Sequence, residues 1–386
     1  MSETSTVLLT RASREHLDAL ERIETASFIT DRISRRSFRR FIDQDIGDFQ
    51  VLLSDGEVVG YYIVLYRQAT QLARLYSLAV APEHRRRGFG TKLLDAAEND
   101  ADERHCLFMR LEVKTDNFVA QAMYHKAGYY DMEIRAEYYE DDSDALVLQK
   151  LLPSFELPEG SNGTQRLVPY RTQTTDFTCG PASLLMAMAY FDIPSNDAHY
   201  EELEIWREAT TIFMTSGHGG CGPHGLARAA LKRGMQVTLH VSVDGPLLLD
   251  SVRNNDKKQV MARIQEYDIA SLKEAGVPIV VGDYTVSQLI ADLNNGKLVV
   301  ALISTYVFDE SKAPHWVLIC AADDNYVYIN DPDQDTFPWQ SAANRQYLPI
   351  PIATFRRAFG FGRRKQKAAL VLEKSDNAPI NQYNDA

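Results

Sequence analysis

Two cysteines in the second half of this 386-residue chain are each followed by Gly-Pro and then by a helix-like run. Cys179 stands in TDFTCGPASLL, and Cys221 stands in GGCGPHGLARAAL. A thiol at the start of a helix is favoured as a thiolate, because the helix dipole places positive charge there. Either cysteine is therefore a candidate nucleophile, and their surroundings must decide between them.

A cysteine nucleophile needs a base, a group that orients the base, and a donor that stabilises the oxyanion. Gln173 precedes Cys179 by six residues, His315 begins a later apolar run, and Asp331 ends the next one. If these two runs pair as a hairpin, the histidine and the aspartate come to the same end of the sheet. Cys179 thus has a candidate for every part of a catalytic site.

Cys221 lacks a glutamine at the matching distance, because glycines and His218 precede it in SGHGGCGPHG. Its segment could form a zinc site with His218 and His224, line a substrate site, or simply cap the following helix. Three ligands on one flexible loop make a poor zinc framework, so we expect no metal. Cys106 and Cys320 lie in apolar strand-like runs and are expected to be core thiols.

A basic, glycine-rich turn lies between a strand-like run and a helix-like run in LYSLAVAPEHRRRGFGTKLL. Gly88 and Gly90 allow a ligand to approach the backbone closely. The N–H groups at the helix start and the side chains of Arg85, Arg86 and Arg87 suit a pyrophosphate. The turn alone is a weak signal, since a solvated basic turn has the same composition.

The stretch HRRRGFGTKL resembles the Arg/Gln-x-x-Gly-x-Gly/Ala signature of the GNAT acetyltransferases. LEVKTDNFVAQAMYHKAGYYD resembles the second conserved block of the RimI-type ribosomal-protein N-terminal acetyltransferases. Residues 1–150 match that family's order of elements, so the resemblance implies a GNAT fold that binds acetyl-CoA, with Glu112 as general base and Tyr124 as proton donor. The cofactor-binding positions that it implies are Leu78, Ala79 and Val80 for the pantetheine arm, Arg86, Arg87, Gly88, Phe89, Gly90 and Thr91 for the pyrophosphate, and Asn117.

The chemistry of acetyl transfer suits these two side chains. A carboxylate can take the proton that an ammonium must lose, and a phenol can protonate the departing thiolate. Glu112 shares a strand face with Arg110 and Lys114, so it could instead be a surface charge, and Tyr124 could be a core-edge aromatic. The acidic run IRAEYYEDDSD could receive the positive end of a peptide, or it could be a solvated loop.

Residues 166–375 resemble the papain-like peptidases that remove double-glycine leaders from bacteriocin precursors, and their relatives outside transporters. The shared features are Gln-x5-Cys-Gly, the GPHGLARAALKRG helix, a histidine that begins an apolar strand, and Asn-Asp-Pro. The catalytic residues that the resemblance implies are Cys179 as nucleophile, His315 as base, Asp331 as orienting group and Gln173 as oxyanion donor. Classical members of this family are fused to a membrane transporter, but no membrane-spanning segment is expected in this chain. A charged insertion near 246–275 is also absent from the family's sequence pattern.

The composition predicts two domains, because 386 residues exceed one ordinary domain and 45% of them are hydrophobic. The formal net charge of −12 disfavours nucleic acid and anionic membranes as partners, and it attracts cationic amines or basic peptides. The four cysteines lack a paired disulfide spacing, the N-terminus lacks a signal peptide, and runs such as KLVVALIS are too short to span a bilayer. These features predict a cytoplasmic protein with free thiols.

The patterning predicts two α+β domains joined by a linker. Residues 1–150 alternate helix-like and strand-like runs, as expected for one mixed sheet. Residues 151–165 begin a stretch rich in Pro, Gly, Ser and Asn and are the expected linker. Residues 166–375 place helices first and an antiparallel sheet after them, and the polar residues 376–386 are expected to be disordered.

These observations predict a bifunctional enzyme. The first domain is expected to move acetyl from acetyl-CoA to an amine, with a peptide or protein α-amine as substrate, and the second to cleave a peptide or isopeptide bond through a thioester on Cys179. One hypothesis couples the two, because cleavage would expose an N-terminus that the transferase could acetylate. Two alternatives stay open: the second domain could only bind peptide, or the transferase could act on a small-molecule amine. The sequence predicts no oligomeric state.

Overall fold

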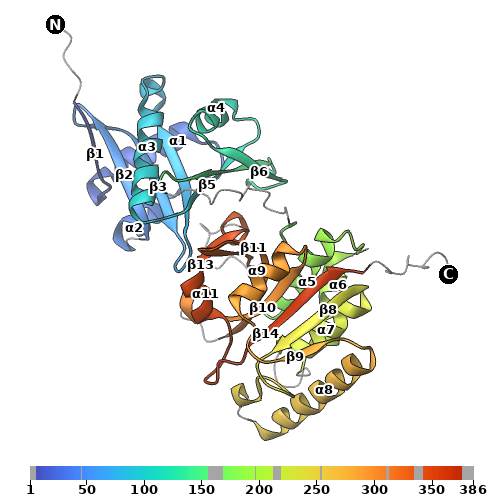
Figure 1. The fold of residues 1–386 in the computed structure, drawn as a ribbon. Helices are drawn as coiled ribbons and strands as arrows, with labels where there is room; N and C mark the ends of the chain where they lie inside the picture. The colour runs from blue at the N-terminus through green and yellow to red at the C-terminus, as the bar shows by residue number, and fades with distance from the viewer. Residues whose placement is uncertain are drawn as a thin grey trace. The chain divides into compact units, whose positions relative to one another are not determined.

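The computed structural model describes residues 6–44, 46–154, 168–195, 197–211, 219–252, 254–309, 313–333 and 342–375. The chain divides into two compact units, Met1–Pro158 and Glu159–Ala386, which Figure 1 colours from blue to green and from green to red. Each unit is built around one sheet with helices packed on it, so the predicted α+β class is confirmed. The predicted linker from residue 155 onward and the predicted tail, 376–386, lie outside the described residues.

The first unit is a seven-stranded mixed sheet in the order β1-β2-β3-β4-β5-β7-β6. Its strands are β1 (Val7–Arg11), β2 (Gly47–Ser54), β3 (Glu57–Tyr66), β4 (Leu72–Val80), β5 (Phe108–Lys114), β6 (Tyr130–Arg135) and β7 (Ala145–Leu151). Its helices are α1 (Leu17–Ser27), α2 (Arg35–Gln44), α3 (Phe89–Glu103) and α4 (Phe118–Lys126). The sequence patterns predict all of these except β1 and β6, the edge strands, whose residues are half-buried or exposed and so carry little apolar signal.

β4 separates from its parallel neighbour β5 after three residues. Among the described residues, β5 pairs with β4 only at Leu72, Ala73 and Arg74, whereas β3 stays paired with β4 as far as Val80. The second half of β4 therefore presents a backbone edge that β5 does not cover. Such an edge can form backbone hydrogen bonds with an extended ligand.

The two faces of this sheet are packed differently. Side chains alternate along a strand, so Tyr62 and Leu111 join the apolar core beneath α3 and α4. The neighbouring residues, Tyr61 of β3 and Glu112 of β5, point to the opposite face. There the Tyr61 hydroxyl donates a hydrogen bond to Glu24 of α1. Polar side chains near β4 and β5 are thereby gathered on one face.

The second unit is a seven-stranded sheet in the order β13-β12-β11-β10-β14-β8-β9. Its strands are β8 (Met235–Val241), β9 (Ile279–Val281), β10 (Leu298–Ser304), β11 (Pro314–Ala322), β12 (Tyr326–Asn330), β13 (Leu348–Pro351) and β14 (Ala368–Lys374). Its helices are α5 (Cys179–Tyr190), α6 (Ala198–Ala209), α7 (Pro223–Lys232), α8 (Asn255–Glu274), α9 (Val286–Asn294), α10 (Tyr306–Asp309) and α11 (Ile352–Ala358). The sheet is not wholly antiparallel as expected, because β8 and β9 pair in parallel, and β9, β13 and β14 are strands that the sequence reading missed.

Helix α5 explains how Cys179 is held. Every residue from Cys179 to Met188 is buried, in accord with its apolar composition on all sides. The helix packs on β11, where the Ser183 hydroxyl donates to the carbonyl oxygen of Trp316 over 3.3 Å. Its first residue is therefore fixed beside the start of β11, where His315 lies.

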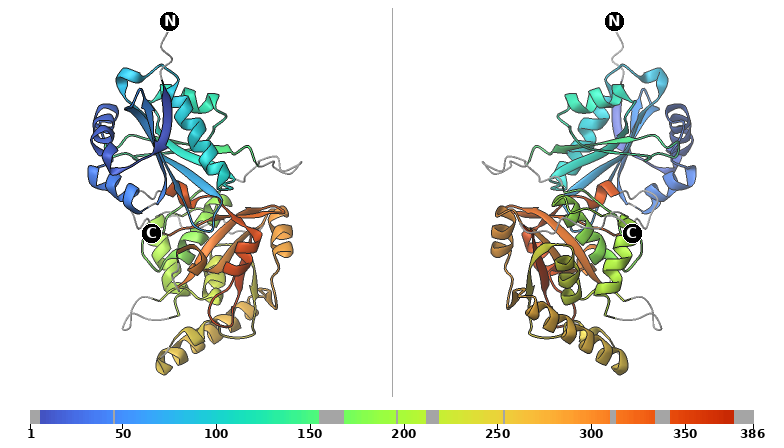
Figure 2. Two further views of the ribbon diagram at one scale, coloured as in Figure 1. Left: turned by 90° about the vertical axis from the view of Figure 1, so that its left-hand side faces the viewer. Right: turned by 90° about the vertical axis from the view of Figure 1, so that its right-hand side faces the viewer.

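The charged insertion is a helix on the outside of this unit. α8 packs against α7, and Arg228 of α7 pairs with the buried Asp268 of α8. Figure 2 shows α8, coloured gold, at the periphery of the unit. Among the described residues, no helix combines the length and the apolar character that a membrane crossing requires.

Candidate active sites

The turn before α3 has the backbone that a phosphate cradle needs. Gly88 caps the helix with φ 81°, and Arg86 has φ 62°, so both adopt the left-handed conformation. A Cβ on Gly90 would lie 3.2 Å from the sulfur of Met123, so a side chain there would crowd α4. The helix N-terminus directs its first N–H groups outward, where an anion can accept them.

The predicted cofactor-binding side chains lie around this turn in different roles. Arg86, Arg87 and Thr91 are exposed, and Phe89 is half-buried beside His84. Arg85 instead braces the turn, since Nε donates to the carbonyl oxygen of Val80 over 3.1 Å and Nη2 to Ser27 Oγ over 3.2 Å. Leu78, Ala79 and Val80 lie on the uncovered part of β4.

Asn117 directly precedes α4, the helix that follows β5 along the chain. Its Oδ1 accepts a hydrogen bond from the backbone N–H of Ala120 over 3.2 Å, so Asn117 is an N-cap of that helix. The cap accounts for an asparagine at this position without a ligand. A contact with acetyl-CoA stays a prediction.

Glu112 is not the surface charge that its strand pattern allowed. Its carboxylate lies 2.8 Å from Nε of Arg74, and the two side chains are only 5% and 7% exposed. Arg74 Nη2 also donates to the hydroxyl of Tyr138 over 2.9 Å. Burial alone would lower the pKa of Arg74, but the negative charge of Glu112 and the Tyr138 side chain hold it above its ordinary value. Glu112 is therefore a buried carboxylate beside a permanent cation.

Tyr124 is buried in α4, with its ring 5.6 Å from that of Tyr129. Burial raises the pKa of Tyr124 to about 12. The phenol stays protonated at neutral pH, which is the state that a proton donor requires. Burial, followed by the charge of Glu112, also raises the pKa of Tyr139, and Tyr124 contributes to that shift. Tyr139 thus lies within electrostatic reach of both predicted catalytic side chains.

The acidic run after β6 is tied down rather than fully solvated. Lys114 Nζ contacts Asp141 Oδ2 over 2.6 Å and Thr30 Oγ1 over 3.2 Å. The backbone N–H groups of Asp31 and Glu140 each donate to the other residue's carboxylate, over 3.2 Å in both directions. These contacts link the loop after α1 with the loop after β6, next to Glu112 and Tyr139.

Glu24 is a buried carboxylate at this site that the sequence reading missed. Its Oε1 accepts the N–H of Ile33 over 2.6 Å, and the hydroxyl of Tyr61 donates to Oε2. Burial raises the pKa of Glu24, although these two hydrogen bonds act in the opposite direction. A signal existed, because Glu24 follows Leu20 by four residues and so falls on the apolar stripe of its helix.

In the second unit, the structure brings the predicted histidine and aspartate together. β11 and β12 pair as an antiparallel hairpin with Leu318 opposite Asn330. His315 Nε2 consequently lies 2.7 Å from Asp331 Oδ1, and the two side chains are 10% and 7% exposed. The carboxylate fixes the orientation of the ring, so its other nitrogen can face a nucleophile.

Cys179 completes this arrangement from the head of α5. Burial would lower the pKa of His315, but the charges of Asp331 and Cys179, together with hydrogen bonds to both, hold it well above its ordinary value. His315 is thus held as an imidazolium between a carboxylate and a sulfur. A histidine between a carboxylate and a cysteine sulfur is the arrangement that a cysteine nucleophile needs.

Gln173 lies beside the same hairpin, on the segment that leads to Cys179. Its backbone N–H donates to the carbonyl oxygen of Pro332 over 2.7 Å, and its side-chain Nε2 donates to Asp333 Oδ1 over 3.3 Å. The amide is therefore held on a carboxylate next to Asp331. Whether it also serves the oxyanion stays a prediction.

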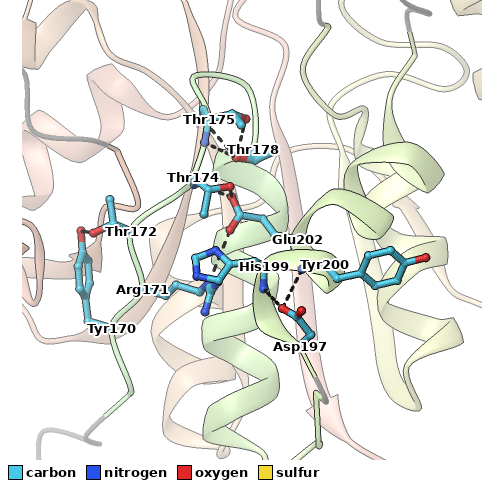
Figure 3. A network of polar contacts seen from close by, with 10 residues as sticks. All are labelled: Tyr170, Arg171, Thr172, Thr174, Thr175, Thr178, Asp197, His199, Tyr200 and Glu202. Atoms are coloured by element: carbon cyan, nitrogen blue, oxygen red, sulfur yellow. Dashed lines mark hydrogen bonds and ion pairs between the residues drawn. The ribbon is translucent and has the colours of Figure 1, made fainter.

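A buried glutamate anchors the segment that carries Gln173 (Figure 3). Glu202 of α6 is fully buried, and its Oε1 accepts the N–H of Thr174 over 2.7 Å and the Thr174 hydroxyl over 3.0 Å. Its Oε2 lies 3.6 Å from Arg171 Nε. Glu202 thus holds the residues on both sides of Gln173, although nothing in its helical pattern distinguished it from a surface charge.

Cys221 lies within electrostatic reach of Cys179, in the segment that leads to α7. Burial and the charge of Cys179 raise the pKa of Cys221 well above its ordinary value, so it stays a neutral thiol. Its carbonyl oxygen accepts the indole N–H of Trp316 over 3.1 Å. His224 Nδ1 lies 3.3 Å from Gln265 Oε1, and burial lowers the pKa of His224 to about 4.

The described residues do not test the zinc alternative for Cys221, His224 and His218. His218 lies outside the described residues, and among those described no group of three or more His, Cys, Asp or Glu could hold a metal. Cys106 and Cys320 are buried free thiols, and burial raises the pKa of Cys106 to about 12. These two cysteines are core residues, as expected.

Both units match families of known proteins. Residues 168–373 match the Peptidase C39 like family, and residues 17–129 match the Acetyltransferase (GNAT) family. The first match covers more than half of the chain. The predicted order of an acetyltransferase domain and a peptidase-like domain is thus confirmed at the level of the families.

Relatives of the first unit are N-acetyltransferases. An uncharacterized N-acetyltransferase of Methanocaldococcus jannaschii is 33% identical over 153 residues, which are 39% of this chain and 96% of the relative. A putative [ribosomal protein bS18]-alanine N-acetyltransferase of Bacillus subtilis is 28% identical over 35% of this chain and 88% of its own length. The crystal structure of the Escherichia coli ribosomal-protein-S18-alanine N-acetyltransferase matches 40% of this chain and 98% of its own, with 23% identity and a TM-score of 0.36. The chain therefore belongs to the Peptidase C39 like family through residues 168–373 and to the GNAT acetyltransferases, as an N-acetyltransferase, through residues 17–129.

Proposed function

We propose that the first unit transfers an acetyl group from acetyl-CoA to the N-terminal α-amine of a peptide or protein. The names of two relatives specify such substrates. One is the putative [ribosomal protein bS18]-alanine N-acetyltransferase of Bacillus subtilis, and the other is an N-alpha-acetyltransferase of Saccharolobus solfataricus. The carboxylates of the loops around Glu112 and Tyr139 favour a cationic substrate end.

The chain's own groups divide the work of acetyl transfer. The uncovered edge of β4 would hold the pantetheine arm, and the N–H groups at Gly88, Phe89 and Gly90 the pyrophosphate. Acetyl-CoA supplies the acetyl group, and its sulfur leaves as a thiolate. Glu112 accepts the proton that the substrate ammonium loses, and the free amine attacks the thioester carbonyl carbon. The C–N bond forms as the C–S bond breaks, and Tyr124 donates the proton that the departing thiolate takes up. The second proton that the nitrogen loses restores Tyr124.

The observation that carries this proposal is the buried, protonated phenol of Tyr124, which belongs to the same core cluster as Val80 at the end of β4 and Val113 of β5. To test it, the protein is incubated with acetyl-CoA and synthetic peptides, and the masses of the peptides are followed. Acetylation of a free N-terminus and none of an N-terminally blocked copy supports the proposal. Acetylation of small amines alone would show the other substrate class.

For the second unit, the proposed activity is hydrolysis of a peptide bond by Cys179, His315 and Asp331. The Cys179 thiolate attacks the carbonyl carbon, His315 gives its proton to the leaving amine, and a thioester forms. His315 then takes a proton from water, which attacks the thioester and releases the acid and the Cys179 thiolate. The 2.7 Å contact between His315 and Asp331, with Cys179 acting on the same ring, carries this proposal.

Peptide cleavage followed by mass spectrometry tests the second activity. Cys179→Ala is expected to abolish cleavage, and Cys221→Ala is the matched control, since its thiol is neutral and its carbonyl rather than its sulfur makes the contact with Trp316. Equal cleavage by both variants would sink the peptidase assignment. If peptides bind without being cleaved by the unaltered protein, the unit is a binding module.

Adding acetyl-CoA to the same reaction tests whether the two activities are coupled. Coupling predicts that the new N-terminus produced by cleavage gains about 42 Da, the mass that one acetylation adds. Cleavage products that never gain this mass would show two independent activities.

A further inference from the structure

The orienting aspartate of the second unit is held by a buried arginine that follows it by fourteen residues. Arg345 Nη1 lies 3.6 Å from Asp331 Oδ2 and 3.4 Å from Asp333 Oδ2, and the arginine side chain is 6% exposed. The two residues are joined through the backbone as well, since the N–H of Asp331 donates to the carbonyl oxygen of Arg345 over 2.8 Å.

The two oxygens of Asp331 have separate partners. Oδ1 receives Nε2 of His315 at 2.7 Å and the backbone N–H of Asp333 at 3.1 Å. Oδ2 faces Arg345. Rotation of the carboxylate would break contacts on both sides, so Arg345 opposes the movement that would turn Oδ1 away from His315.

The charge of Arg345 also offsets the repulsion between two carboxylates that lie beside its guanidinium. Asp331 and Asp333 are two residues apart, and both side chains approach the same guanidinium. Two carboxylates beside one guanidinium repel each other once that cation is removed. Asp331 is the less free to move into solvent, since its side chain is 7% exposed and that of Asp333 is 40% exposed.

From this geometry we propose that Arg345 is a positioning residue for the Cys179 site, acting through Asp331 to keep His315 turned toward the cysteine. The proposal rests on the proposed peptidase function and adds a residue that touches neither the cysteine nor the substrate. Arg345 could not be selected from the sequence, because it lies between the second strand of the hairpin and a strand that the patterns missed.

The test is the rate at which iodoacetamide alkylates Cys179 in the full chain at pH 7, measured by mass spectrometry of the peptide that contains it. This reaction needs the thiolate but no peptide substrate. Arg345→Gln is expected to slow it by about tenfold, which is less than the roughly 100-fold that a misplacement of about 1 Å can cost. Arg345→Lys keeps the charge, so its alkylation rate should fall between those of Arg345→Gln and the unaltered protein. Arg356→Gln, at an exposed arginine of α11, is the matched control and should leave the rate unchanged.

A double-mutant cycle separates positioning from a general loss of structure. Asp331→Asn alone should slow alkylation, and Arg345→Gln should then add less than about twofold, because the residue through which it acts has changed. A full tenfold addition in the Asp331→Asn background, or an unchanged rate in folded Arg345→Gln, would overturn the proposal. If Arg345→Gln does not fold, an alkylation rate of Arg345→Lys equal to that of the unaltered protein would overturn the proposal.

Failure of the underlying function gives a different result. If His315→Asn alkylates as fast as the unaltered protein, Cys179 is not activated and the peptidase assignment fails. If His315→Asn is slow while Arg345→Gln is not, only the positioning role fails.

Discussion

The carboxylate of Glu112 lies 2.8 Å from the guanidinium of Arg74, and both side chains are buried on the same face of the first sheet. The two residues are 38 positions apart in the chain. They meet because β4 and β5 pair in parallel at this point, with Arg74 opposite Arg110 in the register. A carboxylate in such a pair is fixed in place by a charge-assisted hydrogen bond, which suits a group that must meet a substrate in one orientation.

Arg74→Gln should destabilise the protein by about 3 kcal/mol, because it leaves the buried Glu112 carboxylate without its cation. Urea unfolding followed by tyrosine fluorescence and circular dichroism measures the loss. Arg86→Gln, at an exposed arginine of the α3 turn, is the control for the charge change. Equal unfolding of the two variants would contradict the importance of the pair for stability.

Tyr124→Phe should lower kcat for acetyl transfer by about 100-fold, since the ring still packs in the core and only the donated proton is lost. Release of CoA thiol measures the rate, and KM for acetyl-CoA should change little. Because burial raises the pKa of Tyr124 to about 12, the donor stays protonated and activity should show no loss of this acid between pH 7 and pH 9. Tyr130→Phe, at an exposed tyrosine of β6, is the matched control. A kcat equal to that of the unaltered protein would remove Tyr124 from the mechanism.

Iodoacetamide at pH 6 should label Cys179 and spare Cys221. The pKa of His315 lies well above its ordinary value, so the imidazolium that stabilises the thiolate is present at pH 6 and is lost only as the pH rises through that raised pKa. An ordinary thiol has a pKa of about 8.5 and carries little thiolate at pH 6, and the pKa of Cys221 is higher still. Mass spectrometry of the two cysteine peptides gives the ratio. Preferential labelling of Cys221 would reverse the assignment of the nucleophile.

The second unit should lose stability as the pH falls from 6.5 toward 4. Burial lowers the pKa of His224 to about 4, whereas the unfolded chain protonates this residue near 6.5. The stabilisation is thus complete above 6.5 and is lost below it, by up to about 3 kcal/mol from this group. Melting temperatures at pH 7 and pH 5 measure the effect, which should shrink in His224→Gln. His125→Gln, at an exposed histidine of α4, should leave the difference unchanged, and an equal change in both variants would contradict the role of His224.

The patterns that predicted the elements most reliably were those with one clearly buried face. The all-apolar α5 and the strands β10, β11 and β12 could be read directly, because their burial leaves a continuous apolar run. The edge strands β1 and β6 and the three-residue β9 were missed, since half-exposed residues carry no alternation. The alternative that Glu112 is a surface charge was wrong because β5, unlike an edge strand, is covered on both faces. A polar residue on its second face is therefore not a surface residue.

By itself, the sequence determined the two families, the order of the two units, and the choice of Cys179 over Cys221 as the candidate nucleophile. These depend on residue types at short spacings, which can be identified without coordinates. It also indicated that His315 begins one strand and that Asp331 ends the next, which brings both to the same end of the sheet. Only the tertiary structure decided which charges stand against these groups: Arg74 beside Glu112, Arg345 beside Asp331, and Glu202 behind Gln173. The reason is physical, because each of these contacts joins residues that are 14 to 38 positions apart on different elements, and their distance depends on strand register and helix packing that no local pattern encodes.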